Sequence, residues 1–176
     1  MKRVLIATID ATRARLFAYE EGAAPALELR ELRDLVSIER PHHVRDAVSS
    51  TEPGRAGAAD GPAQGNGPHG TTTGYERSAT DDHRDARMDE LDLRFARQVV
   101  QQIEELVNQD AYQHLIISAP PKMLGQLRKV DGVLQRADLH IDDLPQELAH
   151  LSVAQLHDHL AARDLIPPRR RLAAAR

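Results

Sequence analysis

The sequence contains no cysteine and few aromatic residues. Without thiols it has no disulfide framework, no thiolate nucleophile and no cysteine-type zinc or iron–sulfur site. Phe, Tyr and Trp make up 3% of the chain and Trp is absent, which argues against a platform on which nucleic-acid bases stack. Long apolar runs are also missing, because none approaches the roughly 18 residues that cross a bilayer. No membrane partner is therefore expected.

The charge is nearly balanced, with 23 basic and 27 acidic side chains and a net charge of −4. This argues against a protein that coats nucleic acid through bulk charge, and no DNA partner is expected. The apolar run after Met1 ends at Asp10, which is too short for a secretory signal and typical of a first strand. We therefore expect a cytoplasmic protein.

Alternating and continuous apolar runs predict three strands at the start of the chain. Arg3–Asp10 is a short apolar run, and Arg13–Glu20 alternates between small or apolar and larger side chains. Leu27–Val36 alternates with charged residues and fits a third strand, or alternatively a helix. Apolar residues at helical spacing from Met88 to Leu106 then predict a long helix.

The second half of the chain continues with alternating strands and helices. His114–Ser118 is a compact apolar strand, and a helix is expected from Pro121 to Leu134 because proline suits the first helical turn. Ala137–Ile141 is a weak fifth strand. Ser152–Gln155 matches a capping box that opens a last helix.

This order, β-β-β-loop-α-β-α-β-α, is the one found in ribonuclease H-like domains. It predicts an α/β fold with a mixed five-stranded sheet, strands ordered 3-2-1-4-5, and helices on its faces. The chain length suits a single domain, residues 1–166, followed by a basic tail at 167–176.

A long polar segment interrupts this pattern at about residues 39–86. It holds seven of the ten glycines and four of the nine histidines. Structureless stretches of this length in a compact domain are usually functional or disordered. We expect a loop insertion, with a flexible tip at 56–74 where Gly, Ala and Thr dominate.

The predicted sheet places one crevice where the first and fourth strands end side by side. Open α/β sheets bind ligands at such a point, and a helix N-terminus there suits an anion such as phosphate. Asp10 and Arg13 come from one lip, Ser118 and Lys122 from the other. Two-metal nuclease chemistry needs several carboxylates, and the fourth strand ends without one, so no catalytic residue is assigned. Asp10 has a second interpretation, as a turn residue that binds the backbone near Thr12.

The histidines of the polar segment do not predict a metal site. His42, His43, His69 and His83 are irregularly spaced, and histidines in polar loops are generally exposed. No metal and no cofactor are expected.

Five motifs occur in a fixed order along the chain. They are Asp10–Phe17, Glu52–Arg55, Thr80–His83, Phe95–Ala96 and, as the most specific, Ala119–Arg128 with its Ala-Pro-Pro-x-x-Leu-Gly-x-Leu-Arg pattern. Together they resemble the bacterial host-attachment protein family, proteins labelled as required for attachment to host cells.

That family is similar to the middle domain of archaeal and eukaryotic peptide-chain release factors and of ribosome-rescue factors. In those proteins a Gly-Gly-Gln loop lies between the strand meander and the long helix, and residues 39–86 occupy that position here. No Gly-Gly-Gln is present, so peptidyl-tRNA hydrolysis is not implied. The resemblance implies a non-catalytic module that binds ribosomal RNA or tRNA through the loop, in stress or dormancy.

This hypothesis assigns the following residues. The expected RNA or anion contacts are Asp10, Arg13, Arg55, Arg77, His83, Arg84 and Lys122, and the expected loop anchors are Pro53, Gly54, Thr80 and Asp81. Arg55 has a second interpretation, as a salt-bridge partner of Asp10 or Asp81 that holds the loop. Two other functions stay open: an enzyme acting on a phosphorylated molecule or nucleic acid in the Asp10/Ser118 crevice, and a host-attachment or protein-interaction factor.

Overall fold

A computed structural model describes residues 3–22, 28–39, 79–130 and 132–169, with the backbone alone for 79–84. The elements follow the predicted order. They are β1 (Arg3–Ile9), β2 (Arg13–Glu20), β3 (Leu29–Val36), α2 (Ala79–Asp110), β4 (His114–Ser118), α3 (Pro121–Leu127), the 3₁₀ helix η1 (Val133–Gln135), β5 (His140–Leu144) and α4 (Val153–Ala161).

The five strands form one mixed sheet in the order β3-β2-β1-β4-β5. β1 pairs antiparallel with β2, and β2 pairs antiparallel with β3. β4 joins β1 in parallel, and β5 joins β4 in parallel. The predicted fold class and strand order are confirmed, and Leu29–Val36 is a strand rather than a helix because its backbone pairs with β2.

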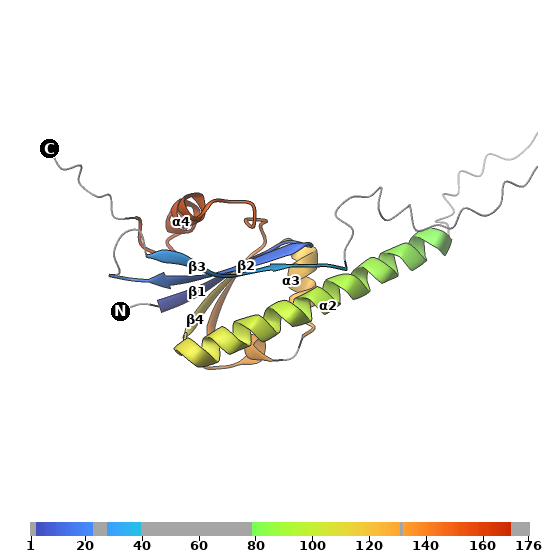
Figure 1. Ribbon diagram of the computed structural model, residues 1–176, viewed down its shortest axis with the longest axis horizontal. Coiled ribbons are helices and arrows are strands. Elements are labelled where there is room, and N and C mark those ends of the chain that lie inside the picture. Colours follow the sequence, from blue (N-terminus) through green and yellow to red (C-terminus); the bar gives the residue numbers. More distant parts are fainter. Residues whose placement is uncertain (1–2, 23–27, 40–78, 131, 170–176) are drawn as a thin grey trace, which may run out of the picture.

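The helices cover both faces of the sheet (Figure 1). On one face, Leu5 and Ile9 of β1 pack in a core with Phe95, Val99 and Ile103 of α2. We call this the α2 face. On the other, Val4, Ile6 and Ile116 pack with Leu156 and Leu160 of α4; this is the α4 face. Period-two alternation along each strand produces the two cores, since neighbouring side chains point to opposite faces.

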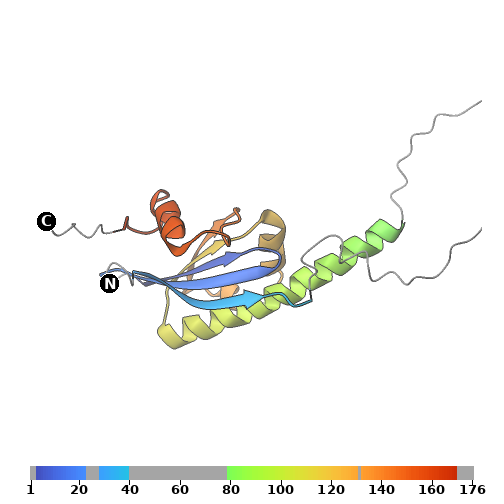
Figure 2. The same ribbon diagram turned by 45° about the horizontal axis from the view of Figure 1, so that its top comes forward.

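α2 is 32 residues long and extends past the sheet at its N-terminal end (Figures 1 and 2). Its regularly buried positions begin at Asp92 and continue to Val107. The helix starts at Ala79, so residues 79–86 are helical and the prediction of a loop there was wrong. These turns carry no apolar stripe, and apolar periodicity is the signal that predicts a helix. Acidic side chains near the start of a helix stabilise it instead, because they interact favourably with the positive end of the helix dipole.

Two predicted boundaries in the second half were also wrong. α3 ends at Leu127 rather than Leu134. Gly132 then adopts φ 136°, a conformation that side chains with Cβ rarely enter, and the chain turns into η1. β5 spans His140–Leu144, three residues later than predicted, because its pairing with β4 sets the position and its own alternation is weak.

The predicted capping box of α4 is confirmed. Ser152 Oγ accepts a hydrogen bond from Gln155 N at 3.3 Å, while Gln155 Oε1 accepts one from Ser152 N at 3.0 Å. Each bond satisfies a backbone N–H at the helix start.

Candidate functional site

The predicted crevice lies at the end of the sheet where β1 and β4 finish. The two strands run parallel, with Thr8 opposite Ser118, so Asp10 and Ala119 follow them at the same edge. The structure thus places Asp10 and Ala119 at one edge of the sheet, while the crevice itself stays a prediction. The contacts of their side chains decide what the crevice can do.

Asp10 organises the turn between β1 and β2. Its Oδ1 accepts hydrogen bonds from Thr12 N at 2.6 Å, Thr12 Oγ1 at 2.9 Å and Arg13 N at 2.7 Å. The Asp10 N–H donates to Arg13 O across the same turn at 2.8 Å. This is the turn interpretation of Asp10, in which the carboxylate replaces backbone partners.

Arg13 forms a two-pronged ion pair with Asp34 of β3. Nε lies 2.8 Å from Oδ1 and Nη2 lies 2.6 Å from Oδ2. The hydrogen bond from Arg13 lowers the pKa of the Asp34 carboxyl from its usual value. The same bond raises the pKa of Arg13. Both side chains are more than two-fifths exposed, so the pair itself contributes little stability.

The other lip is engaged in contacts within the chain as well. Ser118 is fully buried, and its Oγ donates to Gln146 O at 2.6 Å. Lys122 Nζ lies 2.7 Å from Asp89 Oδ1 and 3.6 Å from Asp92 Oδ2 on α2. An anion at this lip would therefore compete with two carboxylates for Lys122.

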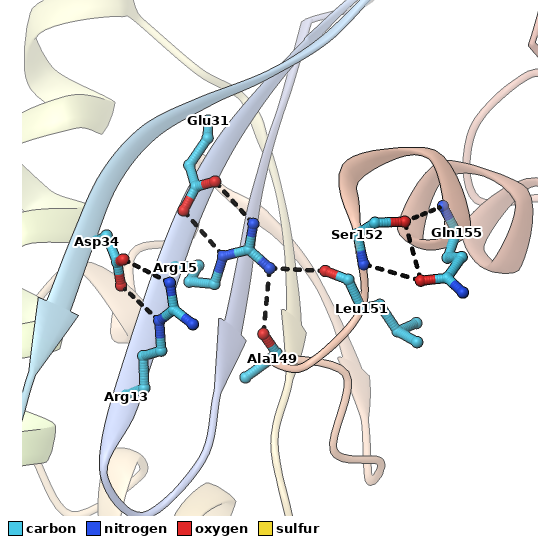
Figure 3. A network of polar contacts seen from close by, with 8 residues as sticks. All are labelled: Arg13, Arg15, Glu31, Asp34, Ala149, Leu151, Ser152 and Gln155. Carbon is cyan, nitrogen blue, oxygen red and sulfur yellow. Dashed lines mark hydrogen bonds and ion pairs between the residues drawn. The ribbon is translucent and has the colours of Figure 1, made fainter.

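Arg15 is the main polar residue that the sequence analysis missed. Its side chain is 10% exposed and forms a fork to both oxygens of Glu31, at 2.8 and 2.7 Å. Nη1 donates to the carbonyls of Ala149 and Leu151, at 3.1 and 2.6 Å (Figure 3). The guanidinium also lies over the Phe17 ring, 4.9 Å from its centroid. Arg15 thus fixes the segment before α4 to the sheet.

The sequence signal for Arg15 was its place in the Asp10–Phe17 motif. An arginine at a position that the alternation points inward, between Ala14 and Leu16 of the opposite face, predicts a buried partner. Ala14, Phe17 and Ala119, which belong to the same motifs, are fully buried. In the described part of the chain, these motif residues hold the fold together.

The remaining predicted contacts cannot be placed in a site. Arg55, Arg77, Pro53 and Gly54 lie outside the described residues. Thr80, Asp81, His83 and Arg84 lie in the first turns of α2, which corrects the prediction that this segment belongs to the loop. Their roles as anchors (Thr80, Asp81) and as RNA contacts (His83, Arg84) stay predictions.

A groove lies between the end of β3 and α2. It has a volume of about 220 Å³ and is lined by Val36, Ser37, Ile38, Glu39, Leu91, Arg94, Phe95 and Gln98. Val36 is 50% exposed and Ile38 is 96% exposed. Arg94 lies at its rim, with Nη1 3.2 Å from Glu39 and Nη2 2.6 Å from Glu90. The groove therefore combines exposed apolar surface with a charged rim.

Within the described ranges, no helix has the length and apolar content needed to cross a membrane.

The mixed sheet in the order 3-2-1-4-5, with helices on both faces, defines an α/β protein with the ribonuclease H-like strand order. Residues 5–160 match the family described as "Protein required for attachment to host cells", and the chain belongs to this family. A comparison with curated proteins gives no match. The similarity to release factors stays a prediction.

Proposed function

We propose that this protein contributes to attachment to host cells by binding a protein partner, and that the partner docks in the groove between β3 and α2. The family description supports the biological role. The observation that carries the site is Ile38, a residue that is 96% exposed beside a groove lined by Leu91 and Phe95. Exposed apolar surface with a polar rim is typical of protein-binding sites.

The chemistry of the groove defines the partner. Val36 and Ile38 offer apolar contact, and Arg94 with Glu39 offers one charge of each sign at the rim. A complementary segment inserts an apolar side chain and carries a carboxylate that competes with Glu39 for Arg94. Such an anchor dominates binding when it is desolvated on docking.

The test is an adherence assay in a strain that lacks the gene and carries variants on a plasmid. Ile38→Asp places a charge in the groove, and we expect adherence to fall to the level of the empty strain. Ala154→Asp adds the same charge at an exposed position of α4 and should restore adherence fully. Circular dichroism of both purified variants checks that the fold is intact. Equal adherence for the two variants would contradict the groove as the docking site.

A second candidate is the translation-associated module, which binds ribosomal RNA or tRNA. The feature that supports it is the N-terminal part of α2, which carries the chain from residue 79 past the sheet (Figures 1 and 2). In this proposal Arg55, Arg77 and Arg84 contact phosphates, and Arg13 and Lys122 keep their ion pairs until RNA displaces Asp34 and Asp89.

This candidate is tested by sedimentation with ribosomes from stationary-phase cells at low salt. Arg55→Ala/Arg77→Ala/Arg84→Ala should weaken association and reduce its salt dependence, because each phosphate contact releases counterions. Ile38→Asp, which leaves these arginines in place, is the matched control. If the wild-type chain stays in the supernatant, this candidate is excluded and the first one is untouched.

A further inference from the structure

Three potential metal ligands gather on the α4 side of the sheet, at the start of its last two strands. His114 begins β4, and His140 begins β5 directly opposite it. Asp142 follows two residues later, opposite Ile116. Residues in register on parallel strands, and residues two apart on one strand, share a face. His114, His140 and Asp142 therefore project together, and we call them the β4–β5 histidine cluster.

The distances within this cluster suit a single small cation. His114 Nε2 lies 2.7 Å from Asp142 Oδ2, and His140 Nε2 lies 3.5 Å from Asp142 Oδ1. One ligand atom from each residue lies within 4.8 Å of the other two. Tetrahedral ligands at about 2.0–2.1 Å from zinc are themselves roughly 3.4 Å apart. The two separations to Asp142 lie on either side of that value, so side-chain movements of about 1 Å would form the site.

The surroundings hold the cluster in place and leave one side open. The side chain of His114 is 13% exposed, that of Asp142 is 33% exposed and that of His140 is 70% exposed. The backbone N–H of His140 donates to Gln113 O at 2.8 Å, which fixes the start of β5 against β4. The ligands thus lie on paired strands, and solvent reaches the cluster from the side of His140.

The two imidazoles and the carboxylate lie close enough to share one cation. The ring centroids of His114 and His140 are 4.9 Å apart, with the planes tilted by 49°. A single Asp142 carboxylate, already directed at both rings, balances part of the charge of one divalent ion. Two imidazoles and a carboxylate, without thiolates, suit Zn²⁺ and its neighbours in the first transition row rather than Mg²⁺ or Ca²⁺.

We propose that His114, His140 and Asp142 bind one Zn²⁺ ion at the β5 edge of the sheet, with a fourth position open to water. The ion joins the edge strand β5 to β4 through side chains, in addition to the backbone ladder. This site is independent of the groove and of the crevice, since it lies at the opposite end of β4 from Ser118.

Calorimetric titration of the chelator-treated full-length protein with ZnCl₂ tests the proposal. We expect one Zn²⁺ per chain in this site and a rise in the midpoint temperature of unfolding, since a ligand that binds only the native state stabilises it. His140→Ala removes an exposed ligand without disturbing the core, and should lower the affinity by at least about tenfold. His150→Ala, which removes an exposed histidine outside the cluster, is the matched control and should bind as the wild type does.

Two further measurements separate this site from the other histidines of the chain. Asp142→Asn should weaken Zn²⁺ binding as His140→Ala does, and both variants should lose the temperature shift. Co²⁺ bound to the wild type should give the strong visible absorption of four-coordinate cobalt, and His140→Ala should not. Absence of Zn²⁺ binding by the wild type, or equal affinity in His140→Ala and His150→Ala, overturns the proposal and leaves the cluster as a set of hydrogen-bonded side chains.

Discussion

The two faces of the sheet bury different kinds of side chain. The α2 face is mainly apolar, with Leu5 and Ile9 of β1 packed in one core with Val99 and Ile103 of α2, and α2 buries one carboxylate, Asp92. The α4 face is apolar only at one end, around Ile6 and Leu156. At the other end it buries Thr8, Arg15 and Ser118.

This difference follows from what covers each face. The long helix α2 presents an apolar stripe from Phe95 to Val107, whereas the short α4 leaves the other end of its face to the segment 145–152, which has backbone groups to satisfy. Arg15 and Ser118 donate to three carbonyls of that segment. Buried backbone carbonyls need such partners. The polar residues at the crevice therefore complete the fold, although their position suggested a ligand site.

The largest effect is expected from Arg15→Ala, which breaks the polar half of the α4 face. The change leaves Glu31 and two carbonyls without their donor, and should lower the free energy of unfolding by about 3 kcal/mol, as for other buried pairs that lose one partner. Urea unfolding measures it. Arg13→Ala removes the neighbouring exposed pair with Asp34 and should cost less than about 1 kcal/mol. Equal losses would show that burial does not distinguish the two pairs.

Asp10→Ala tests whether the rim of the crevice is structural. Three hydrogen bonds to Oδ1 are lost, and the expected cost is about 1–2 kcal/mol, as for the loss of a helix N-cap. Asp10→Asn keeps an oxygen acceptor and should be close to the wild type in thermal unfolding. Any turnover that disappears in Asp10→Asn at unchanged stability would favour the enzyme hypothesis.

Thr8→Val makes the α4 face more like the α2 face. Within the described residues, the Thr8 Oγ1 atom is buried without a hydrogen-bond partner. Replacing an unsatisfied hydroxyl by a methyl of the same shape should raise the free energy of unfolding by about 1 kcal/mol. Thr12→Val, which removes the donor to Asp10, should lower it by a similar amount. A loss of stability in Thr8→Val would indicate a partner for this hydroxyl in solution.

The smallest effect is the pH dependence of the Arg13–Asp34 pair. The hydrogen bond from Arg13 lowers the folded-state pKa of Asp34, so the folded form binds its proton less readily than the unfolded form. The pair's contribution is complete above about pH 4, the ordinary range of Asp, and is lost as the pH falls through the lowered folded-state pKa. In Arg13→Ala the free energy of unfolding should therefore fall less steeply below pH 4 than in the wild type. The difference should be less than about 1 kcal/mol, because both side chains are exposed.

The sequence predicted the order and pairing of the strands because apolar runs such as His114–Ser118 and Arg13–Glu20 carry their own signal. It did not predict the start of α2 or the end of α3. The first turns of α2 carry no apolar periodicity in the sequence, and α3 ends at Leu127, before Gly132 takes a positive φ and starts η1. The position of β5 depends on its partner strand, and so does the β4–β5 histidine cluster. His114 and His140 are 26 positions apart and meet only through that register.

The groove and the role of Arg15 required the structure for a similar reason. Ile38 follows a strand and looks like a core residue in the sequence, but its neighbours in space leave it 96% exposed. The strand alternation points Arg15 inward, but its carbonyl partners Ala149 and Leu151 lie in the segment before α4. In both cases the decisive partner is distant along the chain, and local patterns do not contain it.

The length of α2 has a mechanical consequence. Phe95 lies 16 positions after Ala79, a span of about 24 Å at 1.5 Å per residue. From Asp92 onward the buried residues of the helix hold it against the sheet. Its first turns extend beyond the sheet, so a small tilt of the helix near Phe95 moves its N-terminal end by a larger distance. A tilt of about 5° at Phe95 would move Ala79 by roughly 2 Å over that length. In the proposed docking mode, a partner beside Leu91 and Arg94 would contact the helix near this point, and any resulting displacement would be largest at Ala79.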